Sequence, residues 1–267
     1  MDFYLPKIAQ GSILRVGRYI SPIDIEAQLS PENFLYTHSL MYTYDPYTFT
    51  GIQSINKIND QLTIQFGVHA GNDMAPWTTS SQPNGELLVK WVSKNNKDSL
   101  YGGVDSVGRG YYKNGHDDLQ VAALTYSHKF NDRFTTMTES YYIWQRQALV
   151  GGTVTNGTPQ PYFTGTGPGK LIPGLSDAFG AVNYTSYKLS DKAVVVLRSD
   201  ILADFQGQRT GYATNLLEHT LGYIYHITPW AIIRPEVRLD YSTGPKAYDN
   251  GTKRDQFTFS SDLIIRF

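Results

Sequence analysis

The chain has 267 residues, with 23 basic and 24 acidic side chains and a formal net charge of −1. Nothing in this charge balance supports DNA or RNA binding. No run of about 18 apolar residues occurs, which excludes a transmembrane helix. The absence of cysteine excludes disulfides and thiolate metal sites. Twenty Tyr and 24 Gly indicate strands and turns rather than helices.

In chain order, the residue pattern predicts a partial strand at 3–8, followed by twelve full strands with alternating apolar and polar side chains. The predicted full strands are 12–20, 49–56, 61–69, 86–93, 99–106, 118–130, 133–147, 178–189, 192–205, 216–227, 230–241 and 256–267. Residues 34–44 are also aromatic, and two interpretations stay open for them. They form a further strand, or residues 21–48 form one loop folded inward.

The connections alternate in length. Short turns lie at 93–98, 131–132, 190–191 and 228–229, and long connections lie at 70–85, 107–117, 148–177, 206–215 and 242–253. Membrane β-barrels have short periplasmic turns and long extracellular loops. We therefore expect an all-β antiparallel transmembrane barrel of about twelve or more strands, in which the inward loop belongs to the extracellular side.

The last predicted strand has an apolar face that no charge interrupts. Phe257, Phe259, Leu263 and Ile265 share this face, and the chain ends on the aromatic Phe267. This combination is typical of a lipid-facing strand with its aromatic girdle. A soluble β-sandwich with one wet face is the alternative, because its edge strands show the same alternation.

Charged residues share the opposite face of three late strands. The predicted pore-lining set is Arg198, Asp200, Asp204, Arg234, Glu236, Arg238, Asp240, Asp262 and Arg266. At mid-depth in lipid each of these arginines would cost roughly 2–4 kcal/mol, so they must face water. They could line a pore and orient permeants, or pair across strands and stiffen the wall. Their mixed signs argue against strong selectivity for either ion type.

No residue pattern indicates catalysis or metal binding. The six histidines are scattered without paired-ligand spacing. No short motif isolates a nucleophile. We therefore expect no enzyme, no catalytic residue, no cofactor and no metal.

Short motifs occur in an order that resembles a known family. They are Gly17-Arg18, Thr50-Gly51, Gly71-Asn72-Asp73, the Arg198/Asp200 alternation, Arg234-x-Glu236-x-Arg238-x-Asp240 and the terminal Phe267. This ordered set is similar to the OmpL-like β-barrel porins of Gram-negative outer membranes. The resemblance implies an outer-membrane porin without cofactor or catalytic residues. Asn72, where an aromatic would be usual, and Asp200, where a Glu would be usual, depart from the family pattern and leave details of the lining open.

The sequence therefore predicts one barrel domain over 1–267, shortened at its N-terminus, in the bacterial outer membrane. Its expected function is passive diffusion of small hydrophilic solutes through a charged lumen narrowed by residues 21–48. The expected partners are membrane lipid, these solutes and the barrel-assembly machinery, which would bind Phe267; a homo-oligomer stays open. Two alternatives are an outer-membrane enzyme with a site at the extracellular rim, and a closed structural or adhesive barrel using the 148–177 loop.

Overall fold

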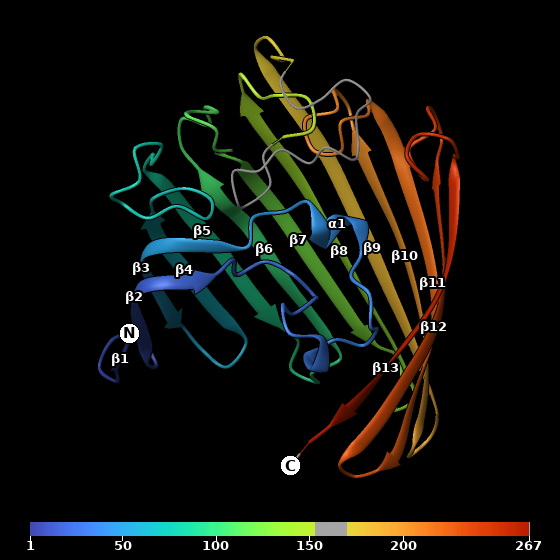
Figure 1. Cartoon of the computed structure of the whole chain (residues 1–267). Coiled ribbons are helices and arrows are strands. Elements are labelled where there is room, and N and C mark those ends of the chain that lie inside the picture. Colours follow the sequence, from blue (N-terminus) through green and yellow to red (C-terminus); the bar gives the residue numbers. More distant parts are fainter. Residues whose placement is uncertain (153–169, 267) are drawn as a thin grey trace.

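The structure, a computed structural model, describes residues 1–152 and 170–266. Thirteen antiparallel strands form one sheet, in which each strand pairs with its neighbours in chain order (Figure 1). The strands are β1 (Asp2–Leu5), β2 (Ser12–Ile20), β3 (Thr48–Lys57), β4 (Leu62–His69), β5 (Asn84–Val92), β6 (Asp98–Val107), β7 (Gln120–Lys129), β8 (Phe134–Arg146), β9 (Leu175–Ser190), β10 (Ala193–Asp204), β11 (Thr214–Thr228), β12 (Ala231–Ser242) and β13 (Asp255–Ile265).

The predicted all-β antiparallel architecture is confirmed, and the strand bounds agree closely. The largest differences are at β1, which ends at Leu5 rather than at residue 8, and at β9, which begins at Leu175 rather than at Ala178. The first residues of β9 continue the ladder with the end of β8, where Leu175 pairs with Arg146 and Asp177 with Trp144. Strand pairing therefore extends into a stretch whose Gly and Pro content suggested a loop.

The sheet is strongly curved, and its two edges are β1 and β13 (Figure 1). Within the described residues, no pairing joins β1 to β13. The connections alternate between short turns at one end of the sheet and long loops at the other, as the sequence predicts. The two ends of the sheet are therefore chemically and structurally distinct.

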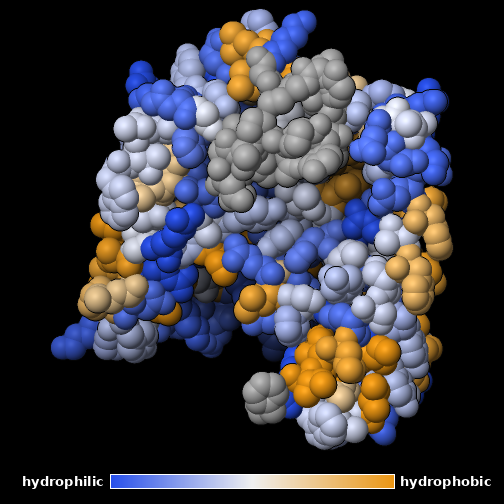
Figure 2. All heavy atoms as spheres, viewed as in Figure 1, coloured by the Kyte–Doolittle hydropathy of each residue, from blue (hydrophilic) through white to orange (hydrophobic). Residues whose placement is uncertain are grey.

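The outer face of the sheet carries large exposed apolar side chains, whereas the inner face carries buried charges. Leu124 and Phe259 on the outer face are 52% and 69% exposed. On the inner face, Arg198 and Glu218 are fully buried. Figure 2 shows hydrophobic side chains along the margins of the sheet and mainly hydrophilic ones in its interior. This distribution is the reverse of that in a water-soluble protein.

Residues 21–47, which connect β2 to β3, lie on the inner face of the sheet (Figure 1). We call them the inner segment. They contain a 3₁₀ turn, η1 (Ser30–Glu32), and one helical turn, α1 (Leu40–Thr43), and residues 34–44 form no strand. No helix in the described residues is long and apolar enough to cross a membrane. The main apolar core lies between this segment and the wall and includes Leu35, Met41 and Tyr141.

Candidate functional site

Two glycines on the wall make room for the inner segment. A Cβ atom on Gly222 of β11 would overlap Cδ2 of Leu35. A Cβ atom on Gly180 of β9 would lie 2.9 Å from Cγ of Met41. Leu35 and Met41 are both almost completely buried. The segment therefore fits into positions where the wall has no side chain, and close packing fixes where it lies.

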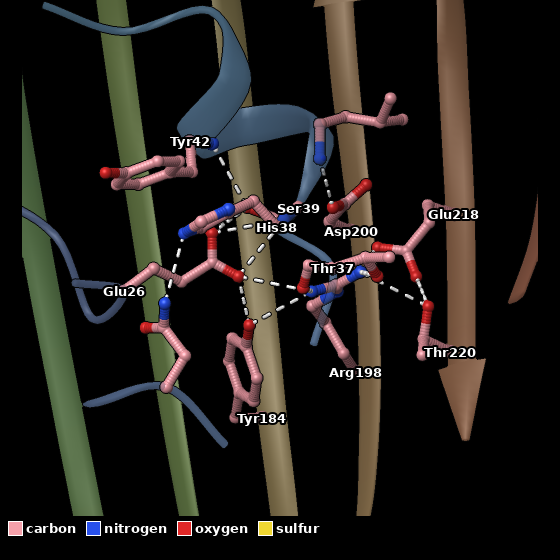
Figure 3. Close-up of polar contacts among 12 residues, drawn as sticks. Glu26, Thr37, His38, Ser39, Tyr42, Tyr184, Arg198, Asp200, Glu218 and Thr220 are labelled. Carbon is pink, nitrogen blue, oxygen red and sulfur yellow. Dashed lines mark hydrogen bonds and ion pairs between the residues drawn. The ribbon is translucent and has the colours of Figure 1, made fainter. Parts of the chain in front are cut away.

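Arg198 of β10 is the centre of a buried polar network between the wall and the segment (Figure 3). Its Nε donates to Oε2 of Glu218 at 2.8 Å, and Nη1 lies 3.3 Å from Oε1 of Glu26. Nη1 also donates to the backbone oxygen of Thr37, and Nη2 to Oγ1 of Thr37 at 3.1 Å and of Thr220 at 3.3 Å. A guanidinium has five donors in a fixed fork, and here every nitrogen has an acceptor.

Glu26 is the counterpart of Arg198 on the segment. Its carboxylate accepts hydrogen bonds from the backbone N–H of Ser39 at 3.1 Å and from the Ser39 hydroxyl at 2.9 Å. The hydroxyl of Tyr184 on β9 also donates to it (Figure 3). Ser39 in turn caps α1 by accepting from the N–H of Tyr42. The Glu26 carboxylate therefore joins two distant parts of the segment to each other and to the wall.

The remaining predicted charges of β10 differ in their partners. Asp200 accepts the backbone N–H of Leu40, at the start of α1, at 2.8 Å (Figure 3). Asp204 instead accepts the backbone N–H groups of Arg209 and Thr210 in the loop after β10. Asp200 is thus part of the segment's attachment, whereas Asp204 stabilises a local turn.

The charges of β12 and β13 hold the other half of the segment. Arg234 pairs with Asp262 across the strands, with Nε 2.9 Å from Oδ1, and also donates to the backbone oxygen of Asn33. Glu236 accepts the N–H groups of Tyr36 and Thr37 at 2.9 and 3.2 Å. The Arg234–Asp262 pair therefore joins two strands, and Arg234 and Glu236 also bond to the segment.

Arg238 pairs with a carboxylate of its own strand and also bonds to the segment. It pairs with Asp240, with Nε 2.8 Å from Oδ2, and donates to the backbone oxygen of His38 at 2.6 Å. Arg266 lies 3.4 Å from the oxygen of Pro31. All nine predicted residues therefore lie on the inner side, and all but Asp204 and Asp240 bond directly to the segment. Whether they line a conducting pore stays a prediction.

Sequence reasoning missed a group of acidic residues on the opposite wall. Glu86 of β5, Asp105 of β6 and Glu139 of β8 are buried on the inner side. Asp105 accepts the Ser21 hydroxyl at 2.8 Å, and Glu139 accepts the N–H of Ile25 at 2.6 Å. The inward position of these residues follows from strand alternation and could have been predicted from the sequence. Their contacts with the segment could not have been predicted, because those contacts depend on where the segment lies.

Two acidic residues of the segment lie against this wall. The pKa of Asp24 is raised well above its usual range by burial and by the nearby charge of Asp45. Burial likewise raises the pKa of Asp45. Asp24 also has a positive φ of 109°, which is rare for a residue with a Cβ atom. The protonation of these two carboxyl groups and the backbone conformation of Asp24 therefore depend on the segment remaining packed against the wall.

Two predictions lie outside the described residues. Most of the 148–177 loop proposed for partner binding, residues 153–169, is not described, and neither is Phe267. Within residues 1–152 and 170–266, no group of three or more His, Asp or Glu is arranged to hold a metal ion.

Comparison with protein families gives one match, over nearly the whole chain. The family described as "Putative beta-barrel porin-2, OmpL-like" matches residues 3–267. No curated protein matches the chain.

Solved porin structures are similar in fold. An anion-selective porin from Comamonas acidovorans superposes with a TM-score of 0.62 at 11% identity, over 96% of this chain and 76% of that one. The outer membrane channel DcaP of Acinetobacter baumannii gives 0.58 at 12% identity, over 95% and 73%. OmpT, an outer membrane protein of Vibrio cholerae, gives 0.54 at 12% identity, over 96% and 76%. At these identities the similarity shows the fold alone.

Proposed function

Because the chain belongs to the OmpL-like β-barrel porin family, we propose that it lets small hydrophilic solutes diffuse passively through a charged lumen narrowed by the inner segment. Its location is the bacterial outer membrane, and porins are channels rather than enzymes. The proposal of a charged, narrowed lumen rests on the inner segment, which crosses the interior of a polar-lined sheet and is held there by buried charges.

A lumen narrowed by the inner segment would select solutes mainly by their size and only weakly by their charge. Arg234 and Arg238 each have a carboxylate partner on the wall, so the field of each pair falls off quickly with distance. Figure 2 shows the molecule hollowed below the inner segment. Solutes that keep most of their hydration would pass beside the segment by diffusion along their gradient.

The experiment that tests the charged lining is a reversal-potential measurement in a planar bilayer under a salt gradient. Replacing both Arg234→Ala and Arg238→Ala leaves Asp262 and Asp240 without their partners, so the variant should become more selective for cations than the parent. Arg133→Ala, an exposed residue in the turn between β7 and β8, is the matched loss of positive charge and should leave the reversal potential almost unchanged. An unchanged reversal potential in the double variant would exclude these arginines from the lining.

The same channel would need assistance to assemble in the outer membrane. We propose that the barrel-assembly machinery binds Phe267, the aromatic residue that follows the apolar alternation of Phe257, Phe259, Leu263 and Ile265 in the sequence. Deleting Phe267 should reduce the amount of protein inserted in the outer membrane, while the conductance of each refolded channel stays as in the parent.

A further inference from the structure

Basic side chains are concentrated at the short-turn end of the sheet. The chain as a whole is nearly neutral, with a formal net charge of −1, yet lysines occur at four successive short turns, from the one after β3 to the one after β9. Six of these lysines belong to the inner face of the sheet. We call them the basic rim, and they are Lys57, Lys90, Lys97, Lys129, Lys188 and Lys192.

Strand alternation places four of these lysines on the inner face. Each lies in β3, β5, β7 or β9, four positions after a residue of the same strand whose side chain bonds to others on the inner face. These inward residues are Gln53, Glu86, Thr125 and Tyr184. Residues an even number of positions apart in a strand point to the same face, so the four lysines face the lumen rather than lipid.

The other two lysines directly precede β6 and β10, and their backbones continue the strand ladder. The oxygen of Lys97 accepts the N–H of Lys129 at 2.7 Å, and the oxygen of Lys192 accepts the N–H of His226 at 2.9 Å. Lys97 is two positions before Ser99, whose hydroxyl bonds to Ser127 on the inner side. Both lysines therefore extend the inner face of their strands to the mouth of the lumen.

Lysines from neighbouring turns act on the same groups. Asp132 accepts a hydrogen bond from Lys129, at 2.8 Å, which lowers the pKa of this carboxyl. The charges of Lys188 and Lys97, from the next turn on either side, lower it further. The lysine charges of three successive turns are therefore close enough to produce one common field.

Acidic side chains offset only half of the basic rim. Three of its lysines each pair with the aspartate three positions later, at 2.7 to 2.8 Å; the pairs are Lys57–Asp60, Lys129–Asp132 and Lys188–Asp191. Among the residues that the structure describes, Lys90, Lys97 and Lys192 form no ion pair. The rim therefore keeps a net positive charge.

The lumen beside the basic rim is lined by small hydroxyl side chains. Ser99 and Ser127 lie 2.6 Å apart between β6 and β7, and Thr135 and Ser186 lie 2.6 Å apart between β8 and β9. Ser127 and Ser186 each lie two positions before a lysine of the rim. Such short polar side chains leave room for water, and Figure 2 shows the molecule hollowed below the inner segment.

We propose that the basic rim concentrates anionic solutes at the periplasmic mouth of the lumen, so that the channel passes solutes bearing carboxylate or phosphate groups faster than cations of the same size. This inference rests on the proposed channel function. Like charges at the mouth of a cavity with low-dielectric walls focus the field and raise the local concentration of counter-ions. The paired arginines beside the inner segment add little to this field, whereas the unpaired lysines of the rim act over about 8 Å at physiological ionic strength.

Neutralising the unpaired lysines tests the inference. In a planar bilayer under a gradient of potassium chloride at low ionic strength, the refolded full-length parent should be more permeable to chloride than to potassium. Combining Lys90→Gln, Lys97→Gln and Lys192→Gln should lower this permeability ratio severalfold. The matched control combines Lys113→Gln, Lys170→Gln and Lys246→Gln, which removes three exposed lysines from the long loops at the other end of the sheet, and it should keep the parent ratio.

Salt separates a field effect from a change in pore shape. In about 1 M salt the Debye length falls to about 3 Å, so the ratios of the parent and the rim variant should converge. A ratio that stays different in high salt would show that the substitutions act by altering the pore rather than its field, and would overturn the inference.

A pair of organic solutes of similar size gives an independent readout. Liposomes containing the parent should take up gluconate, an anion, faster than those containing the rim variant. Glucose, which is neutral, should enter both at the same rate, because the rim variant keeps the width of the lumen. Slower entry of glucose by the same factor as gluconate would contradict a role for charge.

Three further outcomes decide the matter. A parent that prefers potassium, or a rim variant with the chloride preference and gluconate rate of the parent, would overturn the inference while glucose entry still supported the channel. An equal loss of chloride preference in the control would show that the rim has no special role. A folded and inserted parent that passes neither ions nor glucose would instead contradict the proposed channel function, and the inference with it.

Discussion

At the scale of single residues, Arg198 has the most partners in the site. It is fully buried, and it neutralises Glu218 on the wall and Glu26 on the segment. Moving charged groups out of water costs free energy, which the attraction within a buried ion pair offsets. Removing one partner leaves the other charge buried without this compensation. The consequence of losing Arg198 is therefore two uncompensated buried carboxylates.

Arg198→Ala should lower the free energy of unfolding by about 3–5 kcal/mol. Arg15→Ala is the matched control, because the Arg15–Asp2 pair is partly open to solvent, and it should cost at most about 1 kcal/mol. Urea unfolding of the refolded protein, followed by its mobility on gels without heating, measures both. An equal decrease in the free energy of unfolding in both variants would show that the buried network stabilises the protein no more than an exposed ion pair does.

Gly222 provides a second test at the residue scale. Gly222→Ala should displace Leu35, loosen the inner segment and increase the fluctuations of the open-channel current, because the added methyl group occupies the space of Leu35. In Gly85→Ala, the new Cβ would have no neighbour nearer than 3.9 Å, and the current should stay as in the parent. Adding Leu35→Ala to Gly222→Ala should partly restore the fit. Quiet currents in Gly222→Ala alone would contradict this packing account.

At the scale of elements, the strands were predictable and the position of the inner segment was not. Alternation placed Arg198, Arg234 and Arg238 on the inner face because it depends only on neighbouring residues. The contact of Arg198 with Glu26 joins residues 172 positions apart, and no local pattern specifies it.

The inner segment should respond to pH. Asp24 and Asp45 have raised pKa values in the docked segment, so between the ordinary aspartate pKa and the raised values the docked state binds more protons than the released one. Docking is therefore strongest at low pH and weakens as pH rises through this window. Glu26, Glu139 and Asp105 reinforce the effect by repulsion, and Arg209 opposes it.

Open-channel current fluctuations should accordingly increase as the pH rises above the ordinary aspartate pKa and through the raised pKa values of Asp24 and Asp45. Asp24→Asn with Asp45→Asn should remove most of this dependence, because neither side chain can then ionise. Asp60→Asn alters an exposed aspartate whose pKa is lowered by Lys57, and it should leave the dependence intact. Identical pH profiles for the parent and the Asp24/Asp45 variant would show that these carboxyls do not control docking.

At the scale of the whole molecule, the sheet separates two environments. Its outer face carries large exposed apolar side chains, and its inner face holds charges paired with each other and with the segment. The sequence allowed this division to be predicted because strand periodicity is local. The degree to which the segment closes the lumen depends on long-range packing, and only a transport measurement reports it directly.

That measurement is the single-channel conductance of the refolded, full-length protein in a planar lipid bilayer. An open, water-filled lumen beside the inner segment predicts stable current steps that increase linearly with voltage. Folding and insertion should be verified in the same preparation by heat-modifiable gel mobility. A folded and inserted protein that carries no current would contradict the channel account and would favour a closed structural or adhesive barrel.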